Sequence, residues 1–175
     1  MRWGADGRSL ADPLSNGIAR RHRGDYGVYG MIDQTIWRKP GDDGKGVAVF
    51  SRVFANPSDR NLIGWQVDAG MVFTGMIDAR PDDAFGLALS YARISESARG
   101  LDADAIRFGT GVFKRDYEAV IEANYQWQIL PGWTLQPNIQ YVFHPGGHVA
   151  DPMDPTGRTP IRNALVVGLR SGWRY

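Results

Sequence analysis

The sequence predicts an all-β protein, a transmembrane antiparallel β-barrel of the outer-membrane type. Apolar and polar residues alternate over segments of strand length, the apolar rows carry no charge, and the last residue is aromatic. In residues 163–175, Leu165 and Val167 fall on one side of the predicted strand, and Gly168 and Arg170 fall on the other. Successive side chains of a strand point to opposite faces, and a membrane barrel needs one face for lipid and one for a wet interior.

The same alternation predicts seven strands along the chain. The strongest are residues 63–74, 117–129, 133–144 and 163–175, and the weaker ones are 84–94, 46–55 and 26–37. Ser171 is the one polar residue in the four strongest apolar rows, which suits lipid because Lys or Arg at the bilayer midplane costs about 2–4 kcal/mol. The register of 26–37 stays open, since turning Asp33 away from lipid brings Gln34 into the apolar row.

Aromatic residues gather near the predicted strand ends and predict two belts at the membrane surfaces. One belt contains Phe73, Phe85, Trp127, Trp133, Trp173 and Tyr175. The other contains Trp65, Tyr91, Tyr117, Tyr141 and Phe143.

The whole chain, 1–175, reads as one barrel domain. The link at 130–132 is the shortest, so we assign it to the periplasm, where such barrels have short turns. The turns at 39–44 and 78–83 then share that side. Residues 1–25 become an outer loop, and long outer loops are expected near 95–116 and 145–162. An odd strand number predicts the C-terminal part of a larger barrel, unless residues 1–12 contain an eighth strand.

Composition argues against several other classes of protein. The net charge is +1, from 20 basic and 19 acidic residues, which offers no basis for a nucleic-acid partner. Cysteine is absent and the three histidines are scattered, so we expect no metal and no cofactor. Glu118 and Glu122 would lie about 13–14 Å apart on one strand. That distance exceeds the separation in a glycosidase pair, about 5–9.5 Å. We therefore do not expect an enzyme.

The opposite rows of the strands are polar and are expected to line the interior. A neutral sugar requires amide and carboxylate acceptors and guanidinium donors. The predicted lumen-facing residues are Arg52, Asp68, Glu118, Glu122, Asn124, Gln126, Asn138, Gln140, His144 and Arg170, with Gln128, Gln136 and Arg174 beside them. Mixed charges and many amides indicate selection by hydrogen bonding, with no strong preference for one sign of ion.

Several motifs resemble those of the carbohydrate-selective porins of the OprB type. They are SLADP (9–13), NGIARRHRGDYG (16–27), QTIWR (34–38), PSDRNL (57–62), RPDD (80–83), YARIS (91–95), WTLQP (133–137) and QYVFHPGG (140–147). They span nearly the whole chain in the order of the family. The resemblance implies a sixteen-stranded porin barrel, of which these would be about seven C-terminal strands, with sugars crossing by facilitated diffusion.

The resemblance also implies the location and partners. These are the outer membrane of a Gram-negative bacterium, small sugars, outer-membrane lipid and lipopolysaccharide, and the barrel-assembly machinery, which would engage the C-terminal strand. Two alternatives stay open. A truncated or degenerate barrel would have a structural role without independent transport. A soluble lipocalin-like binder would place the apolar rows inside and the polar rows outside.

Overall fold

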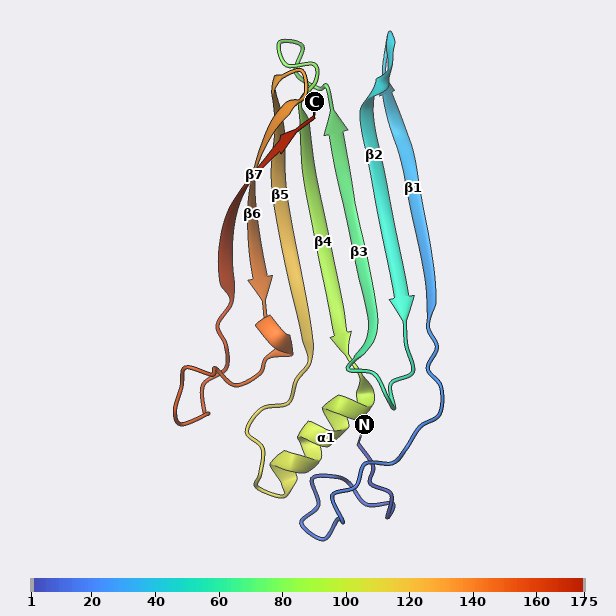
Figure 1. The fold of residues 1–175 in the computed structure, drawn as a ribbon, viewed down its shortest axis with the longest axis vertical. Coiled ribbons are helices and arrows are strands. Elements are labelled where there is room, and N and C mark those ends of the chain that lie inside the picture. Colours follow the sequence, from blue (N-terminus) through green and yellow to red (C-terminus); the bar gives the residue numbers. More distant parts are fainter. Residues whose placement is uncertain (1, 175) are drawn as a thin grey trace.

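The computed structural model describes residues 2–174, except for the side chain of Asp43. It contains one antiparallel sheet with strand order β1-β2-β3-β4-β5-β6-β7 (Figure 1). The strands are β1 (Val28–Lys39), β2 (Asp42–Ala55), β3 (Ile63–Thr74), β4 (Ala84–Ile94), β5 (Tyr117–Leu130), β6 (Trp133–Phe143) and β7 (Ala164–Trp173). The predicted all-β class is confirmed. The strand predicted at 46–55 begins earlier, at Asp42, because Lys39 and Asp42 already pair across the turn.

The register places the predicted apolar rows on one side of the sheet. In one line across four strands, Ala69 lies opposite Leu89, Leu89 opposite Ile121, and Ile121 opposite Tyr141. We call this side the apolar face and the other the polar face. Leu89 and Ile121 are 45% and 49% exposed. A lipocalin-like binder requires such rows to be buried, so this exposure argues against that alternative.

A β-bulge resolves the open register of β1. Gln34 pairs with Val49, so it does lie in the apolar row, and its side-chain amide donates to the backbone carbonyl of Thr35. The register then shifts between Thr35 and Trp37, which brings Trp37 opposite Val47 on the apolar face. The extra residue of a bulge re-aims the side chains that follow it, and this explains why strict alternation fails here.

The two aromatic belts form at opposite ends of the apolar face. Trp65, Tyr91 and Tyr117 stack at one end, with ring centroids 5.2 and 5.1 Å apart. At the other end, the rings of Trp133 and Trp173 stack at 4.6 Å. Tyr175, assigned to the second belt from the sequence, lies outside the described residues.

Short links and long loops separate to opposite ends of the strands (Figure 1). The short-turn end carries residues 40–41, 75–83 and 131–132, as the sequence predicts, although the first turn is shorter than expected. Gly41 and Gly132 adopt φ of 84° and 83° there, a conformation that glycine reaches without a steric penalty. The long-loop end carries residues 2–27, 56–62, 95–116 and 144–163.

A helix that the sequence analysis did not predict lies at the long-loop end. α1 (Glu96–Arg107) begins at Ser95, whose hydroxyl accepts a hydrogen bond from the amide of Ala98. Figure 1 shows the N-terminal segment beside α1, and Arg2 forms two hydrogen bonds with Asp104, at 2.8 and 2.9 Å. The loop at 95–116 is therefore folded against its neighbours. Within residues 2–174, no helix has the length and apolar character needed to cross a membrane.

Candidate functional site: the polar face of the sheet

Two hydrogen-bonded clusters organise the polar face, and the first centres on Asp68 in β3. The hydroxyl of Ser90 donates to the Asp68 carboxylate at 2.6 Å, and the side-chain amide of Gln66 donates to the same oxygen at 2.9 Å. Ser90 lies directly opposite Asp68 on β4. The carboxylate is thus held in place by neutral donors and keeps its acceptor capacity toward the open side of the sheet.

The second cluster centres on Glu122 in β5. Its carboxylate accepts hydrogen bonds from the side-chain amides of Asn124, at 3.0 Å, and Gln140. The carbonyl oxygen of Asn124 accepts in turn from the amide of Gln136 at 3.2 Å. These half-buried side chains form a hydrogen-bond network, and the network fixes each side-chain amide in one orientation. A side chain without such partners would lack this fixed orientation.

A pocket of about 350 Å³ lies between Phe50 and the second cluster. Two glycines let these side chains lie close to the sheet, because the ring of Phe50 covers Gly70 and the amide of Asn124 covers Gly86. A Cβ atom at these glycines would come within 2.6 and 2.9 Å of those side chains. The pocket therefore offers the ring of Phe50 together with the carboxylate of Glu122 and the amide of Asn124.

A second pocket, of about 450 Å³, lies toward the short-turn end between β5, β6 and β7. Gln126 and Gln136 line both pockets, so the two are adjacent on the polar face. The remaining polar side chains that line it are Gln128, Thr134, Arg170 and Arg174.

Most of the predicted lumen residues share this face in the register. Arg52 lies opposite Asp68, Glu122 opposite Gln140, and Asn124 opposite Asn138. Gln126 and Arg170 line the second pocket. Arg52 is exposed and stands 3.9 Å from the carboxylate of Asp33.

Glu118 keeps its place in the polar row but bonds to a loop, whereas His144 leaves the row. Glu118 accepts a hydrogen bond from the backbone amide of Gly146 at 2.6 Å, so it anchors the turn after β6. The prediction that His144 continues the polar row is wrong. β6 ends at Phe143, His144 takes a left-handed conformation, and its ring lies 4.5 Å from that of Tyr117 in the aromatic belt.

Sequence reasoning missed three contributors to the polar face: Gln66, Ser90 and Phe50. Gln66 lies two residues before Asp68 on β3, and Ser90 lies on the neighbouring strand β4. Only the pairing of β3 with β4 brings both side chains to the Asp68 carboxylate. Alternation places Phe50 opposite the row of Val47 and Val49, but it was not among the predicted lumen residues. The paired glycine at position 70 is the signal that could have identified it, because a ring needs such a gap to lie flat on a sheet.

Ion pairs concentrate outside the strands. At the short-turn end, the side chain of Asp83 is buried and accepts hydrogen bonds from Arg80, the hydroxyl of Tyr125 and the amide of Gln128. Burial alone would raise the pKa of Asp83, but these donors outweigh it and the pKa is lowered. At the long-loop end, the Arg115 guanidinium holds Asp102 through bonds of 2.7 and 2.8 Å.

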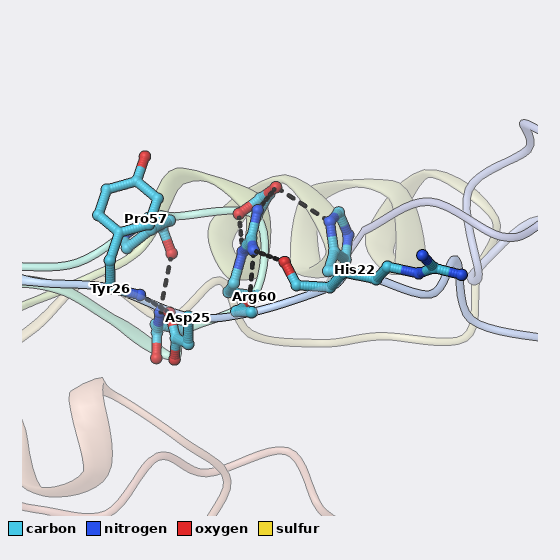
Figure 2. Close-up of polar contacts among 9 residues, drawn as sticks. His22, Asp25, Tyr26, Pro57 and Arg60 are labelled. Atoms are coloured by element: carbon cyan, nitrogen blue, oxygen red, sulfur yellow. Dashed lines mark hydrogen bonds and ion pairs between the residues drawn. The ribbon is translucent and has the colours of Figure 1, made fainter.

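The segment before β1 is tied to the β2–β3 loop (Figure 2). The Asp59 carboxylate stands 3.1 Å from Nδ1 of His22 and accepts hydrogen bonds from Arg60. The Arg60 guanidinium also donates to the carbonyls of Arg23 and Gly24, at 3.2 and 2.7 Å. The hydrogen bonds from Arg60 to the Asp59 carboxylate lower the pKa of Asp59. Two sequence motifs, 16–27 and 57–62, thus act as one structural unit at the long-loop end.

A sheet with one exposed face that is apolar between the strand ends and one hydrogen-bonded polar face defines a class of protein, the β-barrel pore-formers of membranes. Within that class, the chain belongs to the carbohydrate-selective porin, OprB family, whose family model matches residues 3–175. The resemblance seen in the motifs is confirmed.

Two relatives illustrate the match. Porin B of Pseudomonas aeruginosa is 25% identical over 154 residues, which cover 83% of this chain and 32% of Porin B. A high-pH structure of Pseudomonas putida OprB superposes with a TM-score of 0.84 and 21% identity, covering 98% of this chain and 40% of that one. The fold is therefore that of part of the OprB barrel, an open sheet of seven strands. The chain spans about a third of the length of the curated relative it matches.

Proposed function

We propose that this chain forms part of the wall of an outer-membrane pore through which sugars diffuse passively. Membership of a carbohydrate-selective porin family supports this, and the family is one of channels. The observation that carries the proposal is the separation of the two faces. Ile121 on the apolar face is 49% exposed, while its neighbour Glu122 is half-buried in amide hydrogen bonds on the other. A water-filled lumen bounded by lipid requires this arrangement.

We call the pocket of about 350 Å³ between Phe50 and the Glu122 cluster the mid-sheet pocket. In this proposal a neutral sugar contacts the wall there. The Glu122 carboxylate and the Asn124 amide accept from and donate to ring hydroxyls, and the Phe50 ring covers the apolar side of the sugar. Asp68, Asn138 and Gln140 extend the row of hydrogen-bonding groups along the polar face. The path needs no nucleotide or metal, because diffusion follows the sugar gradient.

The apolar face and the strand ends supply the remaining partners in this proposal. Lipid acyl chains contact the apolar face, with the aromatic belts at the two headgroup regions. The charged long-loop end faces outward toward lipopolysaccharide, whose phosphates the basic run at 20–23 would meet. β7, an edge strand of the sheet, is the segment offered to the barrel-assembly machinery.

Reconstitution into planar lipid bilayers tests the proposal. The full chain should produce discrete conductance steps that neutral sugars reduce in a concentration-dependent way, because a bound sugar displaces ions from the pore. A Glu122→Gln variant keeps the size of the side chain and should weaken that reduction. Insertion without sugar-dependent steps would contradict the proposal.

That negative outcome would favour the second candidate, a structural role without independent transport. The specific observation in its favour is coverage, since the chain matches 32% of Porin B and 40% of the solved OprB chain. In that case the sheet would insert and pair with other strands, and β1 and β7 would be the pairing edges.

A further inference from the structure

The second pocket, at the short-turn end, differs in charge from the mid-sheet pocket. Among the described residues that line it, none is acidic, whereas Glu122 lines the mid-sheet pocket. Its polar groups are amides, one hydroxyl and the guanidinium groups of Arg170 and Arg174. The adjacent pockets therefore present opposite preferences for a charged ligand.

Arg170 has no counter-ion within the part of the chain that the structure describes. Several other arginines of this protein are held by carboxylates, as Arg80 is by Asp83 and Arg115 by Asp102. The Arg170 guanidinium has no such partner and stands exposed beside the pocket. The carboxylate of Glu122 is four residues away along the strands, since Gln140 pairs with it and Gln136 pairs with Arg170. That spacing is about 13 Å, beyond the screening length of about 8–10 Å in physiological salt.

Glycines leave room on both sides of Arg170. The polar row of β7 places Gly168 and Gly172 two residues before and after it. The spaces at these glycines are taken by side chains of β6: a Cβ at Gly168 would come within 2.2 Å of the Asn138 amide oxygen, and one at Gly172 within 2.9 Å of the Thr134 hydroxyl. The guanidinium is thus flanked by neutral hydrogen-bonding groups of β6, with Gln136 directly opposite.

We propose that this pocket is a subsite for monosaccharides that carry a carboxylate. A free guanidinium binds a planar carboxylate through two parallel hydrogen bonds, which Lys does not reproduce. Thr134 and Gln136 supply donors and acceptors for the ring hydroxyls. The volume, about 450 Å³, lies within the usual range of small-ligand pockets, about 300–1,000 Å³. This inference rests on the proposed function for its biological role, as it places an acidic-sugar site at the short-turn end of the pore.

Equilibrium binding to the full chain, folded in detergent micelles, tests the subsite without any need for conduction. Titration calorimetry with D-glucuronate and D-glucose should show tighter binding of glucuronate. Arg170→Gln should lower the affinity for glucuronate about tenfold, or about 1.4 kcal/mol, and leave that for glucose unchanged. Arg170→Lys should recover only part of the loss, because it restores the charge without the paired donors.

Arg162→Gln is the matched control, because it removes the same charge from the loop at the far end of the sheet. It should leave glucuronate binding unchanged, and an equal loss in this variant would overturn the subsite in favour of a bulk charge effect. Equal affinities for glucuronate and glucose in the unmodified chain would also overturn it, as would acetate competing as well as glucuronate.

The outcomes separate this inference from the pore proposal. Sugar-dependent conductance without a preference for glucuronate removes the subsite alone. A glucuronate preference that depends on Arg170, in a chain that inserts without conducting, removes the pore proposal and keeps the subsite.

Discussion

The strands and the long-loop end of this molecule are stabilised by different interactions. The strands rely on the backbone hydrogen-bond ladder and on the separation of an apolar face from a polar face. Among the described residues, charged side chains on the apolar face lie only near the strand ends. Arg93, opposite Trp65 at the last ladder positions of β4, pairs with Asp116 beyond the strand. The long-loop end relies on carboxylate–guanidinium pairs and a capped helix. The sheet therefore depends on an apolar surrounding, whereas the long-loop end is built for water.

The largest effect is expected from a substitution that places a charge on the apolar face. Ile121→Arg places a charge in the middle of the apolar face and should prevent stable insertion, at a cost of about 2–4 kcal/mol near the bilayer midplane. The yield of heat-modifiable, membrane-inserted protein measures it on gels run with and without boiling.

The neighbouring position supplies the control for that experiment. Val120→Arg introduces the same side chain one residue away, on the polar face, where Val120 pairs with Ser90 and Val142. This variant should insert normally. If both variants fail, or if only Val120→Arg fails, the assignment of the faces is wrong.

A smaller loss is expected at the long-loop end. Asp102→Asn removes the partner of Arg115, which forms two side-chain hydrogen bonds and one backbone bond with the Asp102 carboxylate. Hydrogen bonds to charged groups contribute about 1.5–3 kcal/mol each, so the segment 108–116 should open while the strands stay intact. Hydrogen exchange resolved by mass spectrometry should show faster exchange in this segment and an unchanged exchange rate in β5. Loss of protection throughout the sheet would mean that the two regions are not independent.

The comparison also explains which parts of the structure the sequence predicts. Alternation is a local property, so six of the strands and both aromatic belts follow directly from the order of residues such as Trp65 and Leu89. The bulge in β1 does not, because Gln34 lies in the apolar row and satisfies its amide on the neighbouring carbonyl of Thr35. The helix after Ser95 was missed because residues 96–107 are mostly small or charged, and alternation does not detect the helical spacing of Ala98, Leu101 and Ala105.

The polar face was predictable by position and less so by contact. Glu122, Asn124 and Gln140 were identified from alternation alone, but their shared network arises from the register of β5 with β6. Glu118 belongs to the same row, yet it is used by the turn after β6. A sequence pattern gives the face of a residue. The hydrogen-bond partner of that residue also depends on the loops, and alternation does not predict their structure.

The short-turn end sharpens the comparison, because among the described residues it contains one buried carboxylate, Asp83, beside ion pairs such as Lys39–Asp78. The lowered pKa of Asp83 means that its charged form stabilises the folded turn. That contribution is complete above the pKa of an unfolded aspartate, about 3.9, and is lost as the pH falls through the folded value. The NMR shift of the Gln128 backbone amide, which donates to the Asp83 carboxylate, should therefore stay constant at neutral pH and change only below about pH 4. Asp83→Asn should abolish this acid transition, and an unchanged transition in that variant would assign it to another group.

The smallest effect is expected in the loop between β6 and β7. One oxygen of Asp154 accepts from the amide and hydroxyl of Thr156, and the other accepts from the amides of Arg158 and Thr159 and the hydroxyl of Thr159. These donors lower the pKa of Asp154, led by the hydroxyls of Thr156 and Thr159. Asp154→Asn replaces one acceptor oxygen with a donor and so disrupts about half of these bonds.

Because the Asp154 side chain is open to water, the freed amides and hydroxyls regain partners from solvent. The thermal unfolding temperature of the Asp154→Asn variant should therefore equal that of the unmodified chain, while limited proteolysis should cut faster within residues 151–159. Thr156→Val provides a graded test, since it removes one of the five donors and should accelerate cutting less than Asp154→Asn does. A fall in the unfolding temperature with Asp154→Asn would show that this loop supports the sheet, contrary to the separation between the strands and the long-loop end.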